Sequence, residues 1–142
     1  MILKNIFLFF AILTIIDAAG LDTQSAGVKG ILFCNNKPAH NVLVKLYDED
    51  FSPIDFDDLL DKGKTNMNGY FELQGYTDEL SPIDPKLNIY HDCNDKYPCK
   101  RKITIRIPKE YISKGKYPRR HFDIGTLDLN GHHKSETRDC FY

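Results

Sequence analysis

Charged side chains gather in two separate stretches of this 142-residue chain. Between positions 96 and 120 the chain has ten basic residues and one acidic residue, Glu110. Between positions 48 and 62 it has seven carboxylates and one lysine. A basic surface attracts anionic ligands such as acidic lipid headgroups, whereas clustered carboxylates suit a hard cation such as Ca²⁺. These two stretches are therefore the first candidates for binding chemistry.

The basic stretch contains a strand with alternating isoleucines, Ile103, Ile105 and Ile107. Since alternate side chains of a strand point to opposite faces, basic side chains share the face opposite these isoleucines. We therefore predict a binding surface for an anionic ligand. Its candidate residues are Lys96, Lys100, Arg101, Lys102, Arg106, Arg119 and Arg120. The competing interpretation is a solvated sheet face whose charge is balanced by the acidic loop.

The acidic stretch lacks the spacing of a known calcium loop. Its carboxylates do not follow the twelve-residue EF-hand pattern, and no glycine stands at the sixth position. We therefore interpret it as a solvated acidic loop and predict no metal site. The loop carboxylates are Asp48, Glu49, Asp50, Asp55, Asp57, Asp58 and Asp61.

No catalytic set emerges from the remaining polar residues. His91 and Asp92 are expected at a strand end, where they bond the local backbone. The pair His132 and His133 would point to opposite faces of a strand and is expected in an exposed loop. No serine lies in a Gly-x-Ser-x-Gly elbow. We predict a protein that is not an enzyme and has no cofactor.

The first twenty residues are typical of a secretory signal peptide. Lys4 precedes an apolar run over 6–16, and Ala18-Ala19-Gly20 supplies small residues for cleavage before Leu21. The run is too short for a membrane span, which needs about 20 residues. We expect residues 21–142 to form one secreted, extracellular domain that does not span a membrane.

The four cysteines all follow the predicted leader, and an even number in a small secreted chain predicts two disulfides. Three pairings are possible. We favour Cys93–Cys99, because the five residues between them form a tight turn, which leaves Cys34–Cys140. The gaps between the cysteines do not match the paired short spacings of a zinc site.

Strand patterns separated by turn residues fill the rest of the chain. Alternating apolar residues predict strands over 27–34, 42–47, 70–74, 87–89, 103–107 and 122–129, with a further strand over 136–140. Short helical turns are expected at 57–61 and 109–112, the second after Pro108. The expected fold is an all-β sandwich of about seven strands in one domain.

In sequence order, several segments resemble the nematode transthyretin-like family. They are Val28–Cys34, Lys37–Ala39, Val42–Asp50, Asp58–Asp61, Thr65 with Gly69–Phe71, Ile83–Pro85, Ile89–Cys93, Cys99–Lys102, Ile107–Ile112, Phe122–Gly125 and Arg138–Cys140. The resemblance implies a secreted prealbumin-like sandwich. It also implies a role that some members have, the bridging of phosphatidylserine on dying cells to engulfment receptors. The hydroxyisourate hydrolases of this fold end in Tyr-Arg-Gly-Ser, and this chain ends at Cys140-Phe141-Tyr142 instead.

Taken together, we expect a non-enzymatic binding or bridging protein that recognises anionic lipid and a protein receptor. The alternative is an extracellular carrier of a small hydrophobic ligand, lined by Phe33, Tyr47, Tyr70 and Tyr90. Nineteen basic residues against twenty acidic ones give a net charge of −1, which argues against a nucleic-acid binder.

Overall fold

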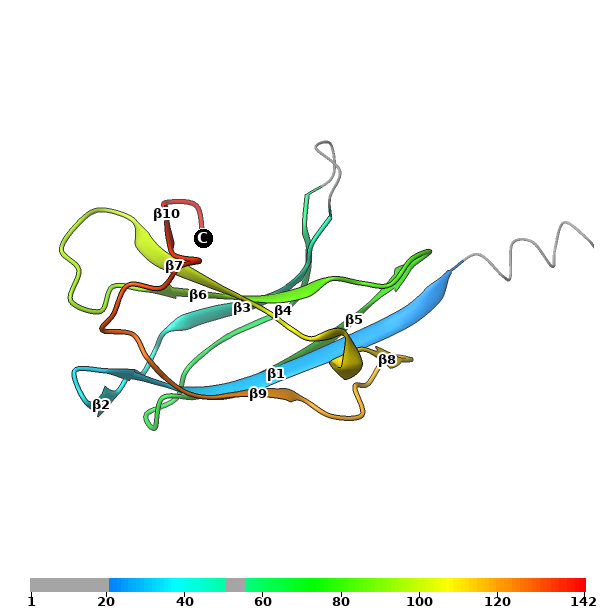
Figure 1. The fold of residues 1–142 in the computed structure, drawn as a ribbon, viewed down its shortest axis with the longest axis horizontal. Helices are drawn as coiled ribbons and strands as arrows, with labels where there is room; N and C mark the ends of the chain where they lie inside the picture. The colour runs from blue at the N-terminus through cyan, green and yellow to red at the C-terminus, as the bar shows by residue number, and fades with distance from the viewer. Residues whose placement is uncertain (1–20, 51–55) are drawn as a thin grey trace, which may run out of the picture.

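The computed structural model describes residues 21–50 and 56–142, which fold into two packed β-sheets (Figure 1). The first sheet contains β1 (Asp22–Cys34), β2 (Lys37–Pro38), β5 (Tyr70–Glu79), β8 (Ser113–Lys114) and β9 (Phe122–Asp128). The second sheet has the order β10-β7-β6-β3-β4, and its strands are β3 (Leu43–Asp48), β4 (Asp58–Lys64), β6 (Pro85–His91), β7 (Lys100–Arg106) and β10 (Thr137–Asp139). The predicted all-β sandwich is confirmed.

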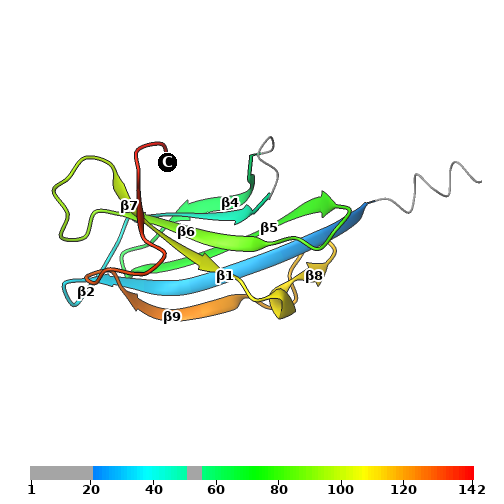
Figure 2. The same ribbon diagram turned by 45° about the horizontal axis from the view of Figure 1, so that its top comes forward.

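Strand β1 organises the first sheet, because it pairs along both of its edges. On one edge β5 runs antiparallel to it from Asp22↔Glu79 to Ile31↔Tyr70. On the other edge β8 pairs antiparallel and β9 pairs parallel, so these two short segments follow each other along β1 (Figure 2). Gly125, with φ at +72°, lies within β9 near the register shift of this pairing.

The core lies between the two sheets and follows the predicted alternation. Val28 and Leu32 from the first sheet are fully buried. From the second sheet, Val44, Leu46 and Leu87 are fully buried as well. The period-2 pattern therefore identified the inward faces correctly.

Seven strands in the described ranges have six or more residues, in agreement with the expected number, and three shorter strands supplement them. A 3₁₀ turn at Lys109–Tyr111 after Pro108 confirms one predicted helical turn. The other, at 57–61, is wrong: most of it belongs to β4, which pairs with β3. Strand pairing supplies these residues with backbone partners that a single isolated helical turn cannot provide.

The predicted pairing of the cysteines is wrong, although two disulfides form. The bonds join Cys34 to Cys93 and Cys99 to Cys140. Cys34 ends β1 and Cys93 follows β6, so the first bond links the two sheets. The second bond extends a strand pairing, because the neighbouring residues Lys100 and Asp139 are partners between β7 and β10. Local spacing favoured a turn bridge because it contains no information on which strands become neighbours.

No helix within 21–50 and 56–142 is long and apolar enough to cross a membrane. The predicted signal peptide, residues 1–20, lies outside the described residues.

We predict that Gly69→Ala destabilises the fold by about 2 kcal/mol or more. Gly69 has φ at +75°, and a Cβ atom there would lie 2.3 Å from the carbonyl oxygen of Leu32. Denaturant unfolding of both proteins would measure the loss. Gly131→Ala is the matched control, since a Cβ atom there meets nothing within 4 Å. Equal stability of the two variants would contradict the prediction.

Candidate functional site

The outward-facing cations of β7 do form the predicted stripe, but each is paired with a carboxylate. Lys100 Nζ lies 3.2 Å from Asp92, and Lys102 Nζ lies 3.3 Å from Asp139. Arg106 forms an ion pair with Glu49. The positive charge of this strand is therefore largely neutralised within the molecule, but only Glu49 belongs to the acidic stretch that the competing interpretation named.

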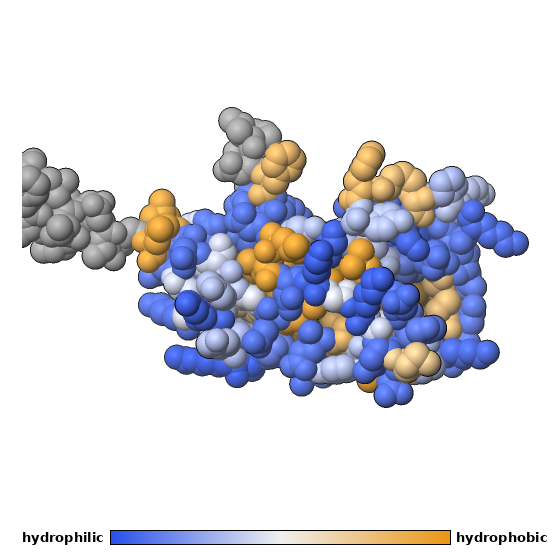
Figure 3. Space-filling view, turned by 180° about the vertical axis from the view of Figure 1, so that it is seen from behind, coloured by the Kyte–Doolittle hydropathy of each residue, from blue (hydrophilic) through white to orange (hydrophobic). Residues whose placement is uncertain are grey.

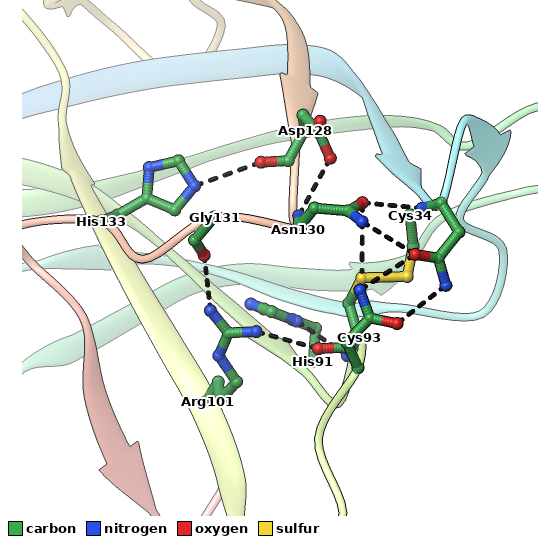
Figure 4. Close-up of a disulfide and its surroundings, with 10 residues drawn as sticks. Cys34, His91, Cys93, Arg101, Asp128, Asn130, Gly131 and His133 are labelled. Carbon is green, nitrogen blue, oxygen red and sulfur yellow. Dashed lines mark hydrogen bonds between the residues drawn. A yellow bond between two sulfur atoms is a disulfide. The ribbon is translucent and has the colours of Figure 1, made fainter.

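Arg101 faces the opposite way and holds the end of the sandwich together. Its guanidinium group pairs with Glu136 and donates hydrogen bonds to the carbonyl oxygens of Cys93 (2.9 Å) and Gly131 (2.6 Å) (Figure 4). The hydrogen bond from Arg101 to Glu136 lowers the pKa of this carboxyl to about 2, so the carboxyl stays ionised. Arg101 is a structural residue with its donors engaged, and it does not contribute to an open anion-binding surface.

His91 lies beside the Cys34–Cys93 disulfide and is buried at the end of β6 (Figure 4). Its Nδ1 accepts a hydrogen bond from the backbone N–H of Cys93 (3.1 Å), which confirms the expected strand-end role. Burial lowers the pKa of His91 to about 4, so the ring is neutral at physiological pH. His132 is 80% exposed on its side chain, as expected for a loop.

The remaining cations of the basic stretch have no carboxylate partner within the described residues. Lys96 is exposed in the turn between β6 and β7, at the end that carries the disulfides. Arg119 is exposed, and Arg120 stacks on the ring of Tyr111 at 4.3 Å. The others are Lys109, Lys114 and Lys116.

Two of these lysines, Lys109 and Lys114, lie near two exposed leucines at the end of the sandwich opposite the disulfides, and Lys116, two residues after β8, lies over the ring of Tyr76 (5.5 Å). Leu80, 79% exposed, occupies the turn between β5 and β6, and Leu21, 64% exposed, precedes β1. Asp22 of β1 pairs with Glu79 of β5. Because these strands run antiparallel, Leu21, just before Asp22, and Leu80, just after Glu79, lie at the same end of the pair. Hydrophobic atoms reach the surface here beside the grey N-terminal segment (Figure 3). We call Leu21, Leu80, Lys109, Lys114 and Lys116 the β8 surface.

A groove with a volume of about 420 Å³, a size that suits a small ligand, is present in this surface. Its lining residues are Asp22, Gln24, Leu80, Ser81, Pro82, Lys109, Ile112, Ser113 and Lys114. The groove therefore combines an apolar wall with two lysines that form no ion pair in the described part of the chain.

Sequence reasoning counted Lys109, Lys114 and Lys116 in the basic stretch but left them out of the candidate surface, and it missed the leucines. Leu80 is a single apolar residue in a polar turn, between Glu79 and Ser81. An isolated leucine in a polar turn is a weak indication of an exposed apolar contact residue, and this indication was present in the sequence. That Leu21 lies beside it depends on the register between β1 and β5, which the sequence does not specify.

The four aromatic residues of the carrier alternative do not share one cavity. Phe33 and Tyr70 belong to the outer face of the first sheet, and Tyr47 and Tyr90 belong to the outer face of the second. The ring of Tyr90 is covered by Tyr142 (centroids 5.9 Å apart). Within a single chain these side chains lie on opposite sides of the sandwich.

The acidic stretch is only partly a solvated loop. Asp48 is buried, and its carboxylate lies with those of Asp50, Asp58 and Glu79, with oxygens all within 4.8 Å of one another. Glu79 comes from the other sheet and was not anticipated. Glu49 and Asp57 instead pair with Lys86, whereas Asp55 lies outside the described residues.

Burial, together with the closeness of these four carboxylates, raises the pKa of two of them, Asp48 and Glu79. Burial, followed by the negative charge of Asp48, raises the pKa of Glu79 to about 7. Burial also raises the pKa of Asp48, whose Oδ1 accepts a hydrogen bond from the N–H of Asp84 (2.8 Å). Four such oxygens could share a proton or hold a hard cation.

We predict that Glu79 lowers the free energy of unfolding by about 2 kcal/mol as pH rises from about 4.5 to about 7, whereas His91, whose pKa is lowered to about 4, acts in the opposite sense over much of this window. In this window folded Glu79 keeps a proton that the unfolded chain releases, so deprotonation favours unfolding. The stability difference between Glu79→Gln and the unmodified protein isolates the Glu79 contribution, and it should shift in favour of Glu79→Gln between about pH 4.5 and about pH 8. Urea titrations across the pH range would measure it. Glu110→Gln, an exposed control, should leave the dependence unchanged, and an unaltered slope in Glu79→Gln would contradict the prediction.

Comparison with known proteins places this geometry in a family. Residues 29–108 match the model of the transthyretin-like family. Transthyretin-like protein 5 of Caenorhabditis elegans is 60% identical over 122 residues, which cover 85% of this chain and 87% of that protein. Transthyretin-like protein 33 of the same organism is 51% identical over 132 residues, covering 92% of each chain.

Among solved structures, a 9R-lipoxygenase from Cyanothece PCC8801 is similar over 78% of this chain and 16% of its own, at 24% identity and a TM-score of 0.38, which is too low to carry an argument. The match of the family model and the identity of the relatives over most of their length are decisive. This chain belongs to the transthyretin-like family.

Proposed function

We propose that this protein is a secreted, non-enzymatic binding domain that attaches to anionic lipid surfaces, with phosphatidylserine as the headgroup, through its β8 surface. The observation that carries the proposal is the set of three lysines, Lys109, Lys114 and Lys116, without a carboxylate partner in the described residues. The two disulfides fit an extracellular protein.

The location of the unpaired cations moves the proposed surface away from β7, because Lys109, Lys114 and Lys116 are not among the candidate residues that the sequence suggested. Lys100, Lys102 and Arg106 already have carboxylate partners, so a ligand would have to compete with those ion pairs. The lysines of the β8 surface offer their charge without such competition. Each basic residue near an anionic bilayer contributes about 1 kcal/mol.

The rest of the molecule remains available to a protein receptor. The β8 surface occupies one end of the sandwich, and the disulfide end lies opposite (Figure 1). A domain bound to lipid at one end would present the other end outward. This arrangement supports the bridging role implied by the family resemblance.

We predict that replacing Lys109, Lys114 and Lys116 together by Gln weakens binding to phosphatidylserine vesicles by about 100-fold. Three lysines at about 1 kcal/mol each correspond to roughly that factor. Co-sedimentation with phosphatidylcholine vesicles, with and without phosphatidylserine, would measure it. Binding of the unmodified protein should also weaken as salt rises, because salt screens surface charge.

The matched control is the triple variant Lys100→Gln, Lys102→Gln and Arg106→Gln, which removes the same number of positive charges from β7. It should retain most of the binding, because those cations are already paired. Equal binding to vesicles without phosphatidylserine would overturn the proposal. A larger loss in the β7 variant than in the β8-surface variant would overturn the assignment of the surface.

A further inference from the structure

The two exposed leucines of the β8 surface flank the last residue pair of the β1–β5 ladder. Leu80 follows directly after β5, and Leu21 directly precedes β1, whose pairing with β5 extends to the last residue, Asp22↔Glu79. Their exposure is therefore a consequence of how the sheet ends. Large apolar side chains exposed together mark an interaction surface more often than singly scattered ones do.

A buried glutamine holds the turn that carries Leu80. The Gln24 side chain donates a hydrogen bond to the carbonyl oxygen of Ser81 (2.8 Å) and accepts one from the N–H of Ile83 (3.0 Å). Gln24 itself belongs to β1 and also pairs with Lys114 of β8. One residue thus fixes the leucine turn and the neighbouring lysine relative to each other.

The charge around the leucines decides which partner fits. Leu80, Lys109 and Lys114 line the same groove together with Asp22, so an apolar side chain shares the groove with two cations and one carboxylate, and the groove carries net positive charge. An anionic bilayer offers the complement, with negative headgroups at the surface and hydrocarbon beneath them. Lysine stems can extend along such a boundary while their ammonium groups stay in water.

The acidic cluster lies on the other side of the same turn. Ser81 and Pro82 line both the groove and the cavity beside Asp48 and Glu79. These carboxylates repel anionic headgroups, so the orientation at a bilayer must turn the lysine side of the turn toward the lipid. The turn therefore separates the groove with Lys109 and Lys114, which attracts an anionic bilayer, from the carboxylate cluster, which repels it.

We propose that Leu80 and Leu21 enter the hydrocarbon boundary of an anionic bilayer while Lys109 and Lys114 contact its headgroups. This inference rests on the proposed attachment to anionic lipid and adds the mode of contact. Attachment by charge alone would leave both leucines in water.

The absence of tryptophan from the chain permits a direct test. In Leu80→Trp the new side chain is the only indole, so its emission reports on this position. With vesicles that contain phosphatidylserine we expect a blue shift of the emission and quenching by acyl chains that carry a bromine label. Vesicles of phosphatidylcholine alone should produce neither effect.

Met67→Trp is the matched control. Met67 is 75% exposed, a degree similar to Leu80, but lies in the turn between β4 and β5, at the opposite end of the sandwich. Its indole should remain unshifted and unquenched in the same vesicles. Equal quenching of the two positions would overturn the proposed orientation.

Leu80→Ser tests the contribution of the side chain to binding. Leu80→Ser should weaken the affinity for vesicles measured by co-sedimentation by about tenfold, because the apolar area that the leucine side chain buries in the bilayer is lost. Normal unfolding by denaturant would establish that the variant is folded. If binding depends on the lysines but Leu80→Ser binds normally and the indole at 80 stays unshifted, insertion is wrong while the proposed function stands. If the unmodified protein binds no vesicle, both are wrong, and a protein partner for this surface becomes the better explanation.

Discussion

The structure depends on the main-chain pairing of β1 along both of its edges. Its thirteen residues hold β5 on one edge and β8 and β9 on the other. Since hydrogen-bonded neighbours satisfy the backbone of a buried strand on both sides, β1 can run through the first sheet without an exposed edge over most of its length. The same pairing brings Leu21 beside Leu80 and Lys114 beside Gln24, so the β8 surface is a direct consequence of it.

The two ends of the sandwich use their charges differently. At one end Arg101 forms an ion pair with Glu136 and donates hydrogen bonds to two carbonyl oxygens, and the Cys34–Cys93 disulfide joins the two sheets nearby. At the other end the lysines of the β8 surface have no carboxylate partner in the described residues. The carboxylates of Asp48, Asp50, Asp58 and Glu79 lie close together on the other side of the β5–β6 turn. Arg101 is thus engaged within the fold, whereas Lys109 and Lys114 keep their charge exposed at the opposite end.

The expectation of a basic surface illustrates how far linear charge can be read. The segment 96–120 does contain an excess of cations, but the net charge at a strand also depends on the carboxylates that neighbouring segments place beside it. β10 places Asp139 next to Lys102, and the segment after β3 places Glu49 next to Arg106. Balance by the acidic stretch was expected and holds for Glu49, but Asp139 lies outside that stretch, and its pairing with Lys102 depends on β10 lying next to β7. The same reason explains Glu79, which joins an acidic cluster whose other members come from positions 48–58.

The sequence by itself determined the sandwich, the inward faces of Val44 and Leu46, the number of longer strands and the formation of two disulfides. These follow from period-2 patterns and composition, which act locally. Only the tertiary structure decided that Cys34 bonds Cys93, that residues 58–61 continue a strand, and that Leu80 shares a groove with Lys109 and Lys114. Those outcomes depend on register and strand order, which arise from pairing between distant segments and leave no trace in local spacing.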